Sequence, residues 1–107
     1  MKNVKMPTSD SYHDALIESL KDPERAAGNI EVALELKEKD PQPDLLRLTL
    51  QDVIEARLQM NNLSEEAKLC YEKLDKILIE TGGVEIYSLV ELLDALGFRI
   101  AVNVAMP

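Results

Sequence analysis

Residues 60–100 constrain the fold of this chain more than any other segment. Apolar residues recur there at helical spacing, but breaks divide the pattern into a very short helix, a second helix and a third. A helix that short buries too little apolar surface to be stable alone. It is stable when it packs across the next helix at a steep angle, which is the arrangement of a helix-turn-helix.

The rest of the chain shows the same helical spacing, with proline and glycine at the ends of the segments. Five or six helices are predicted, over residues 12–21, 23 to about 39, 43–59, 63–68, 70 or 71 to 81, and 87–96. In the short helix, Asn61 or Asn62 is the expected cap and Leu69 fills the turn that follows. Gly82 and Gly83 supply the positive φ that ends the next helix.

Residues 98–104 differ from the helical segments, because they alternate apolar with other residues and are rich in β-branched side chains. This pattern predicts one short strand. A single strand leaves its backbone groups unpaired, and the same strand of a second copy is the simplest partner. We therefore expect a homodimer.

The size of the chain sets the number of domains. Its 107 residues suffice for one hydrophobic core but not for two. Residues 1–9 show no periodicity, so we expect a flexible leader there and a single helix-turn-helix domain over 10–107.

Acidic residues dominate the charge of the chain, and the formal net charge is −8. A dedicated nucleic-acid binder usually has a basic face, so this balance argues against tight DNA binding. It favours docking onto a basic partner. The acidic residues of the first two predicted helices form a solvated face on which such a partner could dock.

Several classes of protein are disfavoured by what the sequence contains. Cys70 is the single cysteine and His13 the single histidine, far apart in sequence, so neither a disulfide within the chain nor a metal site is expected. We expect His13 to be a surface residue. No nucleophile–base pattern or phosphate-binding loop is present, so neither an enzyme nor a cofactor is expected. Without a signal-like or membrane-spanning apolar run, the expectation is a cytoplasmic protein away from membranes.

The ordered landmarks of the sequence resemble one known family. They are DPERAA at 22–27, LLRLTLQDVIEAR at 45–57, MNNLSEEAKL at 60–69, EKLDKIL at 72–78 and SLVELLDALGFRIAV at 88–102. This series is similar to the addiction-module antidote proteins, the antitoxins of toxin–antitoxin operons, which are related to lambda-repressor-like helix-turn-helix proteins. With the elements above, the resemblance implies an all-α, five- or six-helix lambda-repressor-like domain with a short C-terminal strand. It also implies a homodimer that represses its own operon at operator DNA and neutralises a toxin protein.

The resemblance also suggests which residues would contact DNA. They are Asn61, Asn62, Lys68, Tyr71, Glu72, Lys73, Asp75 and Lys76. Tyr71, Glu72 and Asp75 would read bases, and Lys73 and Lys76 would contact bases or phosphates. The amides of Asn61 and Asn62 would bind a phosphate near a helix N-terminus.

Two features depart from what DNA reading requires. Relatives usually carry a small residue where this chain has Lys68, and a serine followed by a basic or polar residue where it has Cys70 and Tyr71. Between residues 61 and 81, three lysines stand against five acidic residues and no arginine is present to pair with guanine. Two hypotheses therefore stay open: a DNA-binding antitoxin, or an antitoxin-like protein-interaction module whose DNA-binding face has degenerated.

Overall fold

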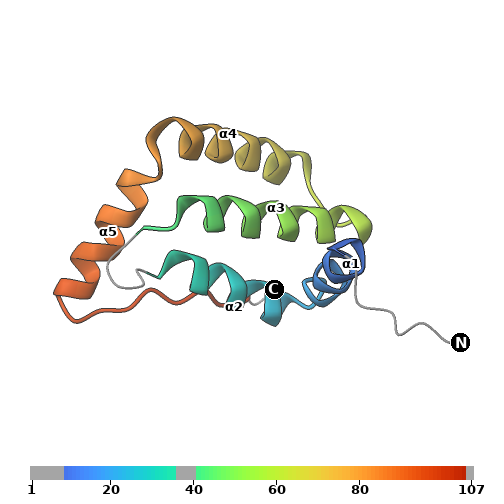
Figure 1. Cartoon of the computed structure of the whole chain (residues 1–107), viewed down its shortest axis with the longest axis horizontal. Coiled ribbons are helices and arrows are strands. Elements are labelled where there is room, and N and C mark those ends of the chain that lie inside the picture. The colour runs from blue at the N-terminus through green and yellow to red at the C-terminus, as the bar shows by residue number, and fades with distance from the viewer. Residues whose placement is uncertain (1–8, 36–40, 106–107) are drawn as a thin grey trace, which may run out of the picture.

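The computed structural model describes residues 9–35 and 41–105, which form five α-helices and no strand. The helices are α1 (Ser9–Ser19), α2 (Pro23–Leu34), α3 (Pro43–Gln59), α4 (Glu65–Thr81) and α5 (Val84–Ala95). The prediction of an all-α fold is confirmed. Figure 1 shows α3 in the middle, with α2 on one side and α4 on the other, while α1 and α5 lie at opposite ends. None of these helices is both long and apolar enough to cross a membrane.

Local sequence signals explain most of the helix ends. The Asp22 side chain accepts a hydrogen bond from the Glu24 backbone N–H, at 3.0 Å, just before Pro23 begins α2. The Ser64 hydroxyl caps α4 in the same way by accepting from the Ala67 N–H, also at 3.0 Å. Gly82 ends α4 in the left-handed region, and its N–H donates to the Leu78 carbonyl.

The core consists of two clusters along the central helix. One joins α1, α2 and α3, and its buried members are Ile17, Leu20, Ala26 and Ala56. The other joins α2, α3, α4 and α5, and its buried members are Ala33, Leu46, Leu78 and Tyr87. In this second cluster the Tyr87 hydroxyl donates to the Ala33 carbonyl at 3.1 Å, so the one large aromatic of this core also has its polar atom satisfied.

The predicted helix-turn-helix over residues 63–78 is wrong. Helix α4 is continuous from Glu65 to Thr81, without a short helix over 63–68 or a turn at Leu69. The reason is local, because this stretch contains no proline or glycine and is rich in strong helix formers. The predicted caps are also corrected: Ser64 caps α4, whereas Asn61 has a φ of 53° just after α3 ends.

The predicted strand over residues 98–104 is also wrong. No strand forms in this part of the described chain, which instead runs from the end of α5 back alongside α2 (Figure 1). The Val102 N–H donates to the Glu31 carboxylate of α2 at 2.9 Å. The homodimer was expected because a single strand would need a partner, and this reason no longer applies. The homodimer stays a prediction.

The remaining boundaries differ less. α3 spans the predicted residues, while α1 and α5 begin three residues early. α2 ends at Leu34 rather than near residue 39, because Glu35 is extended with a ψ of 145°. The predicted leader lies outside the described residues except for Ser9, which begins α1.

Candidate functional site

The eight residues predicted to contact DNA are divided between solvent and the interior. Asn61 and Asn62 are exposed in the connection between α3 and α4, whereas Lys68, Glu72, Lys73 and Lys76 are exposed on α4. The remaining two, Tyr71 and Asp75, are partly buried. The structure thus leaves the lysines accessible. They lie along one straight helix, however, and not on a helix-turn-helix that would present them to DNA.

Asp75 is held by an arginine of the central helix. Arg47 Nε donates to Asp75 Oδ1 at 2.9 Å and Arg47 Nη2 lies 3.4 Å from Oδ2, so the pair links α3 to α4. The hydrogen bond to Asp75 is also the main cause that raises the pKa of Arg47. Asp75 is therefore engaged within the protein and is not free to accept from a base.

Tyr71 lies one helical turn before Asp75 on the same side of α4. Burial is the main cause that raises the pKa of its hydroxyl, and the charge of Asp75 raises it further. Asp75 connects α4 to α3, and Tyr71 lies close enough to Arg47 and Asp52 of α3 for their charges to act on its hydroxyl. Sequence reasoning missed this role because Arg47 lies 28 positions before Asp75, and their pairing depends on how the helices pack.

A surface with different chemistry lies on α5. Leu89, Leu92 and Leu96 follow one another at helical spacing and are 53%, 55% and 60% exposed. The opposite side of the helix carries the buried Tyr87 and Val90. We call Leu89, Leu92 and Leu96 the α5 stripe. An exposed row of leucines on a helix whose other side is already in the core is typical of a surface that binds another protein.

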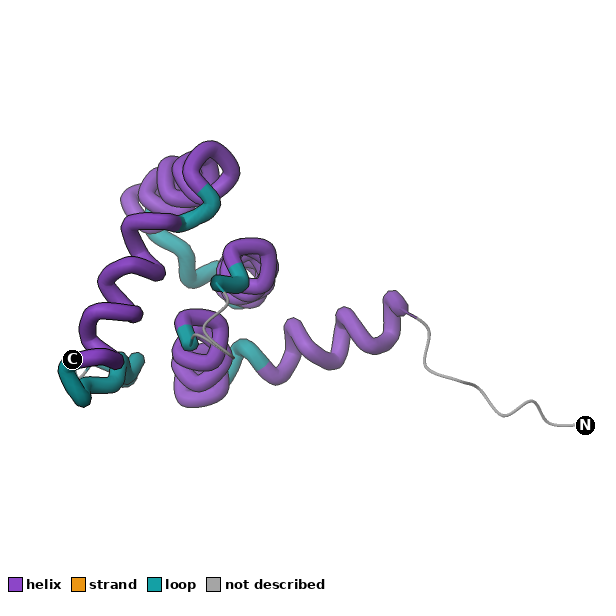
Figure 2. Tube along the Cα trace, turned by 60° about the vertical axis from the view of Figure 1, so that its left-hand side comes forward, coloured by secondary structure: helices purple, strands orange, loops and turns teal. Residues whose placement is uncertain are grey.

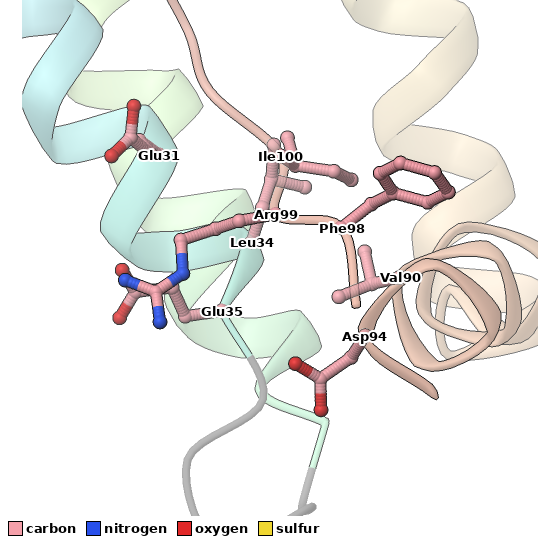
Figure 3. A pocket seen from close by; sticks show the side chains of 8 residues that line it. All are labelled: Glu31, Leu34, Glu35, Val90, Asp94, Phe98, Arg99 and Ile100. Carbon is pink, nitrogen blue, oxygen red and sulfur yellow. The ribbon is translucent and has the colours of Figure 1, made fainter. Parts of the chain in front are cut away.

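Beside α5, a cleft of about 220 Å³ separates this helix and the following residues from the end of α2. It is lined by Glu31, Leu34, Glu35, Val90, Asp94, Phe98, Arg99 and Ile100 (Figure 3). Three of these residues are acidic and one is basic, and Figure 3 shows the Arg99 side chain extending toward Glu35. The volume is smaller than that of most small-molecule sites but is suited to one long side chain.

The cleft brings together residues from two distant parts of the sequence. Glu31 and Glu35 come from the end of α2, whereas Asp94 and Arg99 come from the end of α5 and the residues after it. Sequence reasoning identified an acidic face on the first two helices but not its continuation by Asp94. Helical periodicity shows which residues share a face, but it does not show which faces of different helices meet.

Comparison with models of protein families, with curated proteins and with solved structures gives no match. The resemblance to antitoxins thus rests on the sequence landmarks alone.

Proposed function

We propose that this chain is an antitoxin-type protein-interaction module that binds a basic partner protein through the α5 stripe. The observation that carries the proposal is the exposure of Leu89, Leu92 and Leu96 in one row. The acidic cleft lies on the other side of this helix, at Val90 and Asp94. Burying leucine side chains at the centre of an interface supplies affinity, and the acidic balance of the chain adds complementarity to the lysine and arginine side chains of a basic partner.

The charge of the whole chain supports the same class of partner. A net charge of −8 attracts a basic protein over several ångströms and speeds its encounter. The resemblance to antitoxins suggests a toxin as this partner. Operator DNA has weaker support, because α4 is straight and two of the three expected base readers, Tyr71 and Asp75, are partly buried. Asp75 is also paired with Arg47 of α3.

The proposal is tested by producing the tagged chain together with the product of each adjacent gene. We expect a stable complex with a small basic protein, seen by gel filtration and quantified by calorimetry. Leu92→Lys is expected to weaken it at least tenfold, because it replaces an apolar contact by a charge that also repels the partner. Leu48→Lys is the matched control, since Leu48 is equally exposed, at 54%, but lies on α3.

Two outcomes would overturn the proposal. One is equal binding by the Leu92 and Leu48 variants, which would place the contact elsewhere. The other is tight binding of the chain to DNA from upstream of its own gene at low salt, with no protein partner among the neighbours. That result would favour the DNA-binding hypothesis instead.

A further inference from the structure

Helix α1 packs against α3 at the end of the molecule opposite α5 (Figures 1 and 2). A cluster of metal-ligating side chains lies between these two helices. His13 of α1 meets Asp52 and Glu55 of α3. His13 Nε2 lies 3.2 Å from Glu55 Oε1, and one ligand atom of each of the three residues lies within 4.8 Å of the others. This cluster shares no residue with the cleft or the α5 stripe.

Asp52 is the unusual member of the cluster. It is 5% exposed, and among the described residues it is the one charged side chain that is buried. A largely buried carboxylate destabilises a protein unless hydrogen bonds or positive charge compensate it. Among the described residues of this cluster, His13 is the one basic side chain, and it already lies against Glu55.

The three ligand types define the class of ion that would fit. One imidazole nitrogen and two carboxylate oxygens are suited to Zn²⁺ and its neighbours in the transition series. Bonds of about 2.0–2.2 Å to a tetrahedral ion place ligand atoms about 3.4 Å apart. The His13–Glu55 separation already matches this value, and both side chains are exposed enough to rotate toward Asp52.

The charges of such a site also balance. A neutral imidazole and two ionised carboxylates carry two negative charges, which a divalent cation neutralises. The ion would compensate the buried Asp52 carboxylate and also tie α1 to α3. Asp52 and Glu55 are three positions apart and so lie on one face of α3, which holds two of the ligands at a fixed spacing.

We propose that His13, Asp52 and Glu55 form a binding site for a divalent transition-metal ion, with Zn²⁺ as the ion that the donor set fits best. Three protein ligands leave one tetrahedral position for water or for a group from another molecule. The proposal does not depend on the proposed protein-interaction function, because the two sites lie at opposite ends of the molecule.

The test uses the full chain carrying Cys70→Ser, because the exposed Cys70 thiol is itself a zinc ligand. After removal of metal with a chelator, Zn²⁺ binding is measured by calorimetry, and Co²⁺ binding by its visible absorption. We expect one ion per chain and a rise in the melting temperature with Zn²⁺. His13→Gln, Asp52→Asn and Glu55→Gln are each expected to weaken binding at least tenfold, while Glu65→Gln, at an exposed carboxylate of α4, changes nothing.

The variants are first checked for helix content by circular dichroism, so that loss of binding is not confused with loss of folding. If the folded Cys70→Ser chain binds no Zn²⁺ at a hundredfold excess, His13 and the two carboxylates form only an ion-pair cluster and the proposal is wrong. It is equally wrong if the three ligand variants bind Zn²⁺ as tightly as the Glu65 variant.

Discussion

At the scale of single residues, the most informative side chains are carboxylates whose surroundings differ. Asp75 pairs with Arg47, whereas Asp52 is buried beside Glu55 and His13. Burial is the main cause that raises the pKa of Asp52, and Glu55 raises it further, while His13 opposes this shift. Neither environment follows from the sequence, because each depends on a residue far away in the chain.

Because of Asp52, the stability of the metal-free protein should depend on pH in a defined direction. Because its pKa is higher in the folded than in the unfolded chain, its contribution to stability improves as the pH falls from the raised value toward 3.8. Above that window the ionised carboxylate destabilises the fold. Asp52→Asn removes this penalty and is expected to raise the melting temperature at pH 7 by a few degrees.

The check is thermal unfolding of both proteins in chelator-containing buffer from pH 7 to pH 4. His13 and Glu55, which lie beside Asp52, are present in both proteins, so the difference between the two curves mainly reports Asp52. We expect this difference to shrink as the pH is lowered. A difference that is constant or grows toward acid pH would contradict the direction of the pKa shift.

At the scale of helices, the sequence predicted those elements whose ends carry strong local signals. Pro43 correctly marked the start of α3, and Gly82 correctly marked the end of α4. The prediction failed where it placed a helix break on the apolar pattern alone, since no breaking residue lies near Leu69. It also failed for residues 98–104, because β-branched side chains favour extended backbone but do not supply a neighbouring strand.

The corner between α4 and α5 provides a test at this scale. Gly83 has a φ of 75°, and a Cβ there would lie 3.1 Å from Leu78 Cδ2 and 3.3 Å from the Tyr87 ring. Gly83→Ala therefore combines left-handed strain with crowding in the core. We expect it to lower the free energy of unfolding by about 2–4 kcal/mol.

Two other glycines serve as matched controls in the same urea denaturation series. Gly82→Ala carries the left-handed strain without a close contact, so a smaller loss of about 1–2 kcal/mol is expected. Gly28→Ala lies within α2 with open space around it and is expected to stabilise the protein by about 0.5–1 kcal/mol. Equal stability of the Gly82 and Gly83 variants would show that the contact with Leu78 and Tyr87 is unimportant.

At the scale of the whole molecule, two forces act on the α5 stripe in opposite directions. Its exposed leucines favour association with any apolar surface, including that of a second copy. The net charge of −8 opposes contact between copies but favours contact with a basic partner. The predicted homodimer and the proposed complex with a basic protein therefore respond to salt with opposite signs.

Salt screens charges that are more than about 10 Å apart at 0.1 M ionic strength. Raising NaCl from low to high concentration should thus strengthen self-association of the isolated chain, measured by sedimentation equilibrium. The same change should weaken the complex with a basic partner, measured by calorimetry. Leu92→Lys should reduce both, whereas Leu48→Lys should leave both nearly unchanged. Self-association that weakens with salt would mean that the copies meet through ion pairs rather than through the α5 stripe.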